Sequence, residues 1–258
     1  MKQYEVEFMI DGYRYSQQMI EAFDFERNKH VLHELIYLGA ELTDTEEQPI
    51  SYIDVDFMSK TAAAQNSLKA RVDLGTDKLL SLYKDEIART DQMWKEIVAE
   101  FKEGDPYQNC ITHMKVSGVT MDELGEGLML AMAGHDSSLA ANPEHYGHVM
   151  ANDVPTGFEG MGLFGGPNLM RINFAPDIHV PLEIEADWLP FTIGYSELGD
   201  GTDMHTIAAH YIKETAEGIE MLLTVFFPQG TPKELVDGHK VHLASEFLGL
   251  VKIAADQL

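Results

Sequence analysis

The sequence predicts an α+β protein, with a mostly helical N-terminal region and a curved antiparallel sheet that grips a long C-terminal helix. In the first part, apolar residues recur at three- and four-residue steps over residues 76–101, which is typical of an amphipathic helix. Later segments at 169–174, 204–212 and 219–227 are rich in β-branched and aromatic residues, as strands are. Residues 231–234 then supply an N-cap hydroxyl, a proline and a glutamate at N3, which together predict the start of the last helix.

The N-terminal region contains two expected strands, because residues 4–10 and 51–57 alternate between apolar and polar side chains. The run Gly104-Asp105-Pro106 ends the helical pattern, since glycine and proline terminate helices and proline restricts the residue before it to extended geometry. We therefore predict a domain boundary there. Residues 1–104 would form the mostly helical N-terminal region, and residues 105–258 the sheet-and-helix domain.

Local signals define the elements beyond this boundary. Residues 109–116 alternate like a strand, and Thr120 followed three residues later by Glu123 is the capping box of a helix. A Gly/Pro-rich stretch follows at 155–167, and Glu217-Gly218 provides a turn between the last two strand segments, which predicts a long hairpin. A sheet that grips a helix tends to leave an apolar cavity between the two, and such cavities bind ligands.

Charge and composition exclude several classes of function. The 258 residues include 43 acidic and 18 basic ones, a formal net charge of −25, so nucleic acids and anionic membrane surfaces should repel the chain. It has no signal-peptide-like apolar core and no run of about 18 apolar residues, which predicts a cytoplasmic protein. The single cysteine, Cys110, excludes a cysteine metal cage, so any metal would need histidine and carboxylate ligands.

Histidines and carboxylates gather in the second half of the chain. His242 and Glu246 are four residues apart on the predicted last helix, so both project from one face and could chelate one cation. Spacing alone favours a solvated pair, but apolar neighbours favour a buried one, which needs a partner or a metal. Glu144 lies in a second cluster at 142–148, which is otherwise typical of a polar loop. His113 alternates with its strand neighbours and points into the cavity if its face is the inner one.

Four segments of this half resemble a known family, the phloretin hydrolase and 2,4-diacetylphloroglucinol hydrolase group. They are residues 112–120 with their Gly-Val-Thr end, the Pro-Glu-His-Tyr element at 143–146, the hairpin at 210–221, and the pair His242 and Glu246. All four occur in the family's order, over roughly residues 107–250. The resemblance implies a Bet v 1-like helix-grip fold. It also implies hydrolysis of the carbon–carbon bond between an acyl group and a phenolic ring, with Zn²⁺ held by two histidines and two glutamates.

Carried over residue by residue, the resemblance makes His113, Glu144, His242 and Glu246 the zinc ligands. The separation of His113 from Glu144 is also similar to the family's. One segment departs from the family pattern: the helix after Gly-Val-Thr lacks the family's tryptophans and ends in Gly-His in place of Trp-His. The pocket wall, and with it the substrate, should therefore differ. A shifted alignment at this step would make His135 a ligand in place of His113.

The expected acid–base group is His210, because it begins the hairpin segment that resembles the family and its strand parity points it inward. A hydrogen-bonded core histidine is the simpler interpretation of the same residue. Glu220 is expected to orient this histidine. The residues expected to contact substrate are Tyr107, Tyr195, Met129 and Met132.

Other interpretations of the sequence remain open. Residues 160–165 match G-x-G-x-x-G, but the strand and helix that a dinucleotide site requires do not flank them, so the 157–168 segment is expected to be a loop, with a lid over the cavity as one role. The fold could instead serve a non-catalytic protein that binds a hydrophobic ligand, or a zinc hydrolase of esters or amides. The expected partners are a small aromatic or ketone substrate and a second copy of the chain, because the helix at 76–101 could form a homodimer surface.

Overall fold

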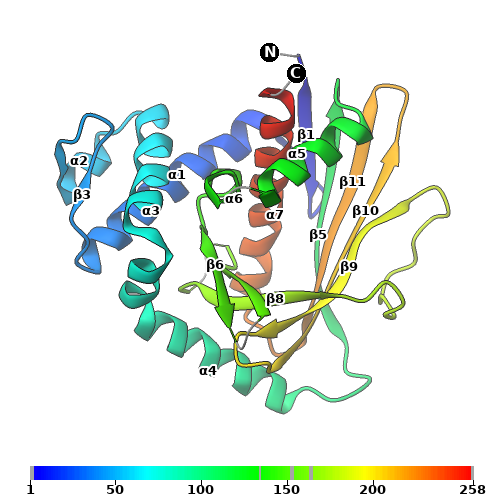
Figure 1. Ribbon diagram of the computed structural model, residues 1–258. Coiled ribbons are helices and arrows are strands. Elements are labelled where there is room, and N and C mark those ends of the chain that lie inside the picture. The colour runs from blue at the N-terminus through cyan, green and yellow to red at the C-terminus, as the bar shows by residue number, and fades with distance from the viewer. Residues whose placement is uncertain (1–2, 134, 152–153, 163–164, 257–258) are drawn as a thin grey trace.

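One antiparallel sheet dominates the computed structural model, which describes residues 3–133, 135–151, 154–162 and 165–256. Its strands are β1 (Glu5–Ile10), β2 (Tyr13–Ser16), β5 (Tyr107–Ser117), β6 (His145–Ala151), β7 (Val154–Glu159), β8 (Asn168–Phe174), β9 (Leu189–Leu198), β10 (Asp203–Glu214) and β11 (Gly218–Pro228). In the described residues the spatial order is β2-β1-β5-β11-β10-β9-β8-β7-β6 (Figure 1). Two further strands, β3 (Leu42–Thr43) and β4 (Pro49–Ile50), pair separately.

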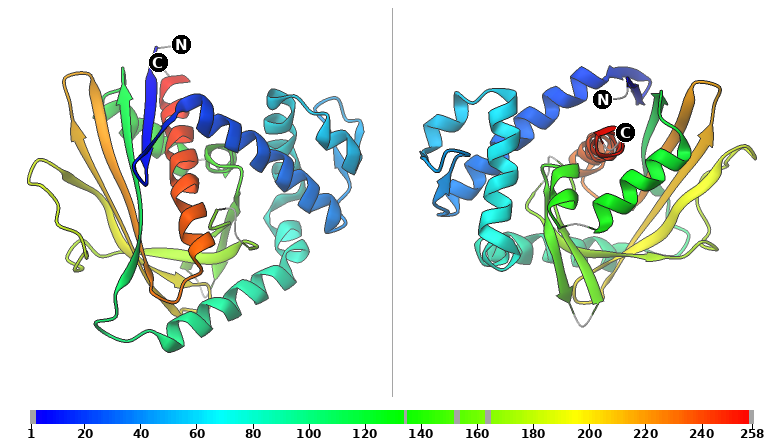
Figure 2. Two further views of the ribbon diagram at one scale, coloured as in Figure 1. Left: turned by 180° about the vertical axis from the view of Figure 1, so that it is seen from behind. Right: turned by 45° about the horizontal axis from the view of Figure 1, so that its top comes forward.

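The described helices are α1 (Gln17–Tyr37), α2 (Tyr52–Asp56), α3 (Lys60–Leu82), α4 (Lys84–Glu100), α5 (Met121–Ala133), α6 (His135–Ala141) and α7 (Lys233–Asp256). The last of them, α7, runs along the inside of the sheet and packs against α1, α5 and α6 (Figure 1). Figure 2 shows α7 nearly end-on, between the sheet on one side and the layer of α1 and α3 on the other. The α+β class, with a large antiparallel sheet and a C-terminal helix, is therefore as predicted.

The core lies between α7 and the inner face of the sheet. On β5 the inner positions are Cys110, Thr112, Met114 and Val116, all buried. The Thr112 hydroxyl donates to the Lys240 carbonyl oxygen of α7 at 2.8 Å, so a polar side chain on this face also binds the helix. The apolar alternate residues of β5 thus face the core, and the side chain of His113 lies on the opposite face of the strand.

The N-terminal region is part of the same body. β1 pairs with β5 along Glu5–Ile10, with Phe8 opposite Met114, so residues before the expected boundary extend the main sheet. The helix α1 packs against both α3 and α7. A division at residue 104 therefore does not separate the sheet from the helices.

Two expected N-terminal elements take a different form. Residues 51–57, expected as a strand, form α2, because Ser51 and Asp54 make a reciprocal capping box that starts a helix. The single helix expected over 76–101 is divided at Tyr83 between α3 and α4. Tyr83 is fully buried and donates its hydroxyl hydrogen to Glu34 of α1 at 2.7 Å, so the chain bends where this side chain is anchored.

The apolar stripe of α4 is used within the chain. Trp94 is buried and stacks on Phe227 of β11, with ring centroids 6.2 Å apart. This stripe therefore does not supply a free homodimer surface, and the homodimer stays a prediction. Searching the described part of the chain for a helix both long and apolar enough to cross a bilayer finds none.

Candidate metal centre

Three side chains from two separate segments converge beside α7. Ligand atoms of His145, His242 and Glu246 all lie within 4.8 Å of one another. His242 and Glu246 come from successive turns of α7, and His145 is the first residue of β6. Both imidazoles are buried, and the Glu246 carboxylate is about one-third exposed. Two imidazoles and a carboxylate with one open side are a donor set that binds Zn²⁺.

Hydrogen bonds on the far sides of both rings fix which nitrogen faces the centre. His145 Nδ1 lies 3.0 Å from the Ser138 carbonyl oxygen, which only accepts, so Nδ1 carries the proton. The other nitrogen, Nε2, is buried without a hydrogen-bond partner among the described residues. His242 Nδ1 likewise lies 3.2 Å from Glu144 Oε2, and its Nε2 faces Glu246 Oε2 at 3.9 Å. An orphaned imidazole nitrogen beside a second imidazole and a carboxylate fits a metal ion.

Glu159 adds a further carboxylate beside this cluster. It pairs across the β6–β7 ladder with His145, and its Oε2 lies 3.5 Å from His145 Nε2. Burial raises the pKa of the Glu159 carboxyl above its ordinary value. Neither His145 nor Glu159 is predicted as a site residue from the sequence. His145 lay in the 142–148 cluster as a neighbour of Glu144, whereas Glu159 gave no signal, because its position depends on the pairing of two strands that were expected to be loop.

A buried arginine from α3 holds the segment that carries His145. Arg71 Nη1 donates to the carbonyl oxygens of Leu139 and Asn142, each at 2.9 Å, and of His145 at 2.6 Å. Burial lowers the pKa of Arg71 to about 10, which still leaves it charged at neutral pH. The connection from α6 to β6 is thereby fixed to α3, and the first residue of β6 is positioned with it.

The electrostatics of the cluster favour a neutral His145. Burial lowers the pKa of His145 to about 4, so its Nε2 lone pair is available at neutral pH. Burial also acts to lower the pKa of His242, but the carboxylates of Glu144, Glu246 and Glu159 outweigh it and raise that pKa. Burial would raise the pKa of Glu144, yet His242 and Arg27 lower it to about 2. Glu144 is therefore a carboxylate over the whole physiological range.

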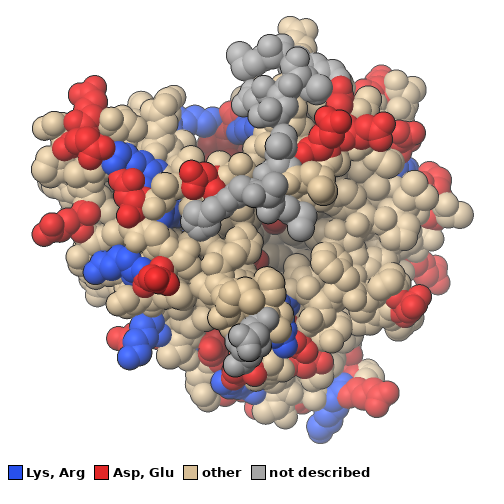
Figure 3. Space-filling model, in the orientation of Figure 1, with Lys and Arg blue, Asp and Glu red and all other residues tan. Residues whose placement is uncertain are grey.

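A cavity of about 470 Å³ opens beside the cluster. Its polar lining residues are Ser138, His145, His148, Glu159, Arg171 and Glu246. The apolar walls include Leu128, Phe158, Met170, Ile172 and Leu250. On the face in Figure 3 the surface between α5 and β8 is hollowed and mostly uncharged, while acidic side chains are spread around it. Such a cavity suits a ligand with an apolar body and polar groups that meet the cluster.

The structure does not bring His113 to this cluster. His113 lies on the outer face of β5, where its Nε2 donates to Glu220 Oε2 at 3.1 Å and its ring meets the edge of Trp188. Lys115 is also there, 3.0 Å from Glu220. The expectation that the face of His113 is the inner one is wrong, because the apolar alternate residues of β5 take the inner positions. Glu220 for the same reason lies far from the inner face and does not orient His210.

His210 does lie on the inner face, as its parity predicts. Its ring meets Phe247 of α7 edge-on at 5.3 Å between centroids, and Nδ1 accepts a hydrogen bond from the Thr224 backbone N–H at 3.2 Å. Burial lowers its pKa to about 4. His210 is not among the residues that line the 470 Å³ cavity.

The expected substrate contacts are dispersed. Tyr195 pairs with Ile207 on the outer face of the sheet, and the Met129 side chain is 69% exposed on α5. The side chains of Met132 and His135 lie outside the described residues. In the Gly-rich segment, residues 157–159 belong to β7 and Gly162 packs against the Gly238 carbonyl of α7, while residues 163–164 are outside the described part.

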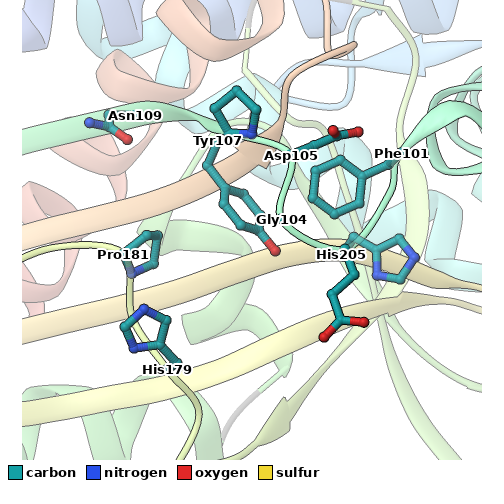
Figure 4. Close-up of a pocket in the computed structure, with 10 residues that line it drawn as sticks. Phe101, Gly104, Asp105, Tyr107, Asn109, His179, Pro181 and His205 are labelled. Carbon is teal, nitrogen blue, oxygen red and sulfur yellow. The ribbon is translucent and has the colours of Figure 1, made fainter.

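Tyr107 lines a different cavity, of about 630 Å³, on the outer side of the sheet. In Figure 4, Tyr107 lies between Pro181 and His179 on one side and Phe101 and His205 on the other. The Phe101 ring is 5.3 Å from both the Tyr107 and the His205 rings, between centroids. Tyr107 is therefore in a different cavity from His145 and Glu246, and the substrate contact predicted at Tyr107 does not lie at the candidate metal centre.

Comparison with known proteins adds no assignment. No protein-family model matches the sequence, and no curated protein matches it. The resemblance of the four segments to the acylphenol hydrolases therefore remains a prediction that rests on those residues.

Proposed function

We propose that this chain is a zinc-dependent hydrolase that cleaves the carbon–carbon bond between an acyl group and a phenolic ring, on a Bet v 1-like helix-grip fold. The observation that carries this proposal is the convergence of His145, His242 and Glu246 at the wall of a largely apolar cavity. A bound Zn²⁺ would act there as a Lewis acid toward a phenolic or carbonyl oxygen of the substrate. The resemblance of the four segments supports the choice of substrate class.

The chain's own residues would orient the substrate. Leu128, Phe158 and Leu250 offer apolar contacts to a flat ring, and the ring's oxygen substituents would face His145 and Glu246. Burial of the ring in this cavity also excludes water from most of its surface. The substrate would thus be bound with its acyl group beside the carboxylates.

The reaction needs one proton transfer at the ring. Water adds its hydroxyl to the acyl carbon, the carbon–carbon bond breaks, and the ring carbon takes up a proton, so a carboxylic acid and a phenol leave. Glu159 lines the cavity 3.5 Å from His145 and is positioned to carry that proton. This assigns to Glu159 the role that the sequence suggested for His210, which lies outside the cavity wall.

Metal content tests the proposal first. Elemental mass spectrometry of the protein purified without chelator should find about one zinc per chain, and less in His242→Ala and Glu246→Gln variants that keep the far-UV circular dichroism spectrum. A panel of acylphenols, esters and amides, with carboxylic acid release as the readout, then identifies the bond that is cleaved. Absence of metal from the folded wild-type protein would contradict the proposal and favour a hydrophobic-ligand-binding protein.

A further inference from the structure

A buried ion pair lies on the far side of His242 from the metal-binding cluster. Glu144 Oε2 is 3.2 Å from His242 Nδ1, and Glu144 Oε1 accepts a hydrogen bond from Arg27 Nη2 at 2.5 Å. The exposed fractions of the three side chains are 18% for Arg27, 8% for Glu144 and 2% for His242. They come from α1, from the residue before β6 and from α7, so three separate segments meet at this point.

The geometry separates Glu144 from the ion that the cluster would hold. The two nitrogens of an imidazole point to different sides of the ring. His242 uses Nδ1 for Glu144 and turns Nε2 toward Glu246, so the ring itself stands between Glu144 and the convergence point. Both oxygens of Glu144 are already engaged, one by His242 and one by Arg27.

The space around the pair also leaves no room for a ligand. The void lined by Arg27, Glu144 and His242 measures about 10 Å³, which is at most the space of one water molecule. Substrate therefore cannot reach Glu144 from this side. Glu144 can therefore act on the candidate metal centre only through another residue, His242.

We propose that Glu144 is a positioning residue for the metal centre and that Arg27 is its counter-ion. This inference rests on the proposed zinc site and replaces the ligand role that the resemblance implies for Glu144. The carboxylate accepts the Nδ1 proton of His242, which fixes the tautomer and the ring orientation and makes Nε2 a better donor to the metal. Arg27 holds the carboxylate in place and balances its buried charge.

Zinc affinity separates a positioning residue from a ligand. The proteins compared by chelator competition are wild type, Glu144→Gln, Arg27→Met and the control Glu34→Gln. Like Glu144, Glu34 has a carboxylate that accepts a side-chain hydrogen bond. Glu34 lies on α1, its donor is Tyr83, and it does not contact His242. Loss of an orienting carboxylate weakens zinc binding about 10- to 100-fold. We expect that loss in Glu144→Gln, a smaller one in Arg27→Met, and unchanged affinity in the control.

Two spectra supply readouts besides affinity. Cobalt(II)-substituted Glu144→Gln should keep the visible bands of the wild type, because the ligand set is unchanged, whereas Glu246→Gln should shift them. Long-range ¹H–¹⁵N spectra of the wild-type protein, with His242 assigned by its own substitution, should place a proton on Nδ1. This second measurement needs no Glu144 variant, so it decides the question even where that variant does not fold.

The outcomes distinguish this inference from the proposed function. A wild-type protein that binds no zinc overturns both. Zinc binding in the wild type together with unchanged affinity in Glu144→Gln overturns only the positioning role. Altered cobalt bands in Glu144→Gln would make Glu144 a direct ligand, and a bare Nδ1 on His242 in the NMR spectrum would remove the hydrogen bond on which the inference depends.

Discussion

Arg71 offers the sharpest test of how this fold holds its candidate site. Its guanidinium is buried and donates to the carbonyl oxygens of Ser67, Leu139, Asn142 and His145. The change to make is Arg71→Met, which keeps an unbranched apolar stem and removes the donors. We expect the free energy of unfolding to fall by about 2–4 kcal/mol, because buried carbonyl oxygens lose a charged donor.

The magnitude follows from the bonds that are lost. Each buried carbonyl left without a donor costs about 1–3 kcal/mol. The Asn142 carbonyl keeps the His145 backbone N–H as a donor at 3.3 Å, so the Leu139 and His145 carbonyls would together cost about 2–6 kcal/mol. Part of this is offset, because the variant no longer buries a cation without a carboxylate partner. The remaining loss should be concentrated in the connection that carries His145.

Urea unfolding followed by circular dichroism, in the presence of chelator, measures this effect without any contribution from bound metal. Arg89→Met is the matched control: Arg89 is exposed, pairs with Glu86 on the surface of α4, and should change the unfolding free energy by less than about 0.5 kcal/mol. If Arg71→Met unfolds within about 1 kcal/mol of the wild type, other contacts hold the connection and the reasoning is refuted.

Three further predictions concern single positions. His145→Gln should abolish zinc binding while His113→Gln retains it, as chelator competition would show; the reverse pattern would restore the ligand set that the resemblance implies. Burial lowers the pKa of His210 to about 4 from its ordinary value of 6.5, so this residue stays neutral in the folded chain while the unfolded chain takes up a proton. Its contribution is full above pH 6.5 and is lost as the pH falls toward 4, by about 3 kcal/mol. Urea titrations at several pH values should show a weaker decline for His210→Asn, and an identical decline would contradict the assignment. Gly249→Ala should lower the melting temperature, because a Cβ there would lie 2.0 Å from a carbonyl oxygen at the end of α6, whereas Gly125→Ala, with open space, should raise it; equal shifts in the two variants would count against this packing argument.

Elements with local signals could be predicted from the sequence. Thr120 and Glu123 form the expected reciprocal hydrogen bonds at the start of α5, and the β10–β11 hairpin and α7 occur where turn and helix-start residues predict them. The strands β6 and β7 could not be found in the same way. They are short, contain histidine, glycine and proline, and exist because they extend a sheet that the rest of the chain has already formed.

The candidate site shows the same division between local and long-range information. The i,i+4 spacing of His242 and Glu246 is a local pattern that the sequence shows directly, and both residues lie in the candidate metal cluster. The inner face of β5 was also readable, since Met114 and Val116 are its apolar alternate residues and leave His113 with Lys115 outside. No local pattern could place His145 against His242, because that contact depends on where the end of α6 meets α7.

The long-range contacts of the site come largely from the N-terminal helices. Arg71 of α3 binds the backbone of the 139–145 segment, and Arg27 of α1 binds the side chain of Glu144 within it. The charge of Arg71 is used on backbone carbonyl oxygens, whereas Arg27 pairs directly with Glu144, whose side chain is only 8% exposed. Without Arg27, the burial of the Glu144 carboxylate would be less favourable. Side chains of the N-terminal helices thus hold the segment that carries Glu144 and His145, so residues on both sides of the predicted boundary at residue 104 build the candidate metal centre.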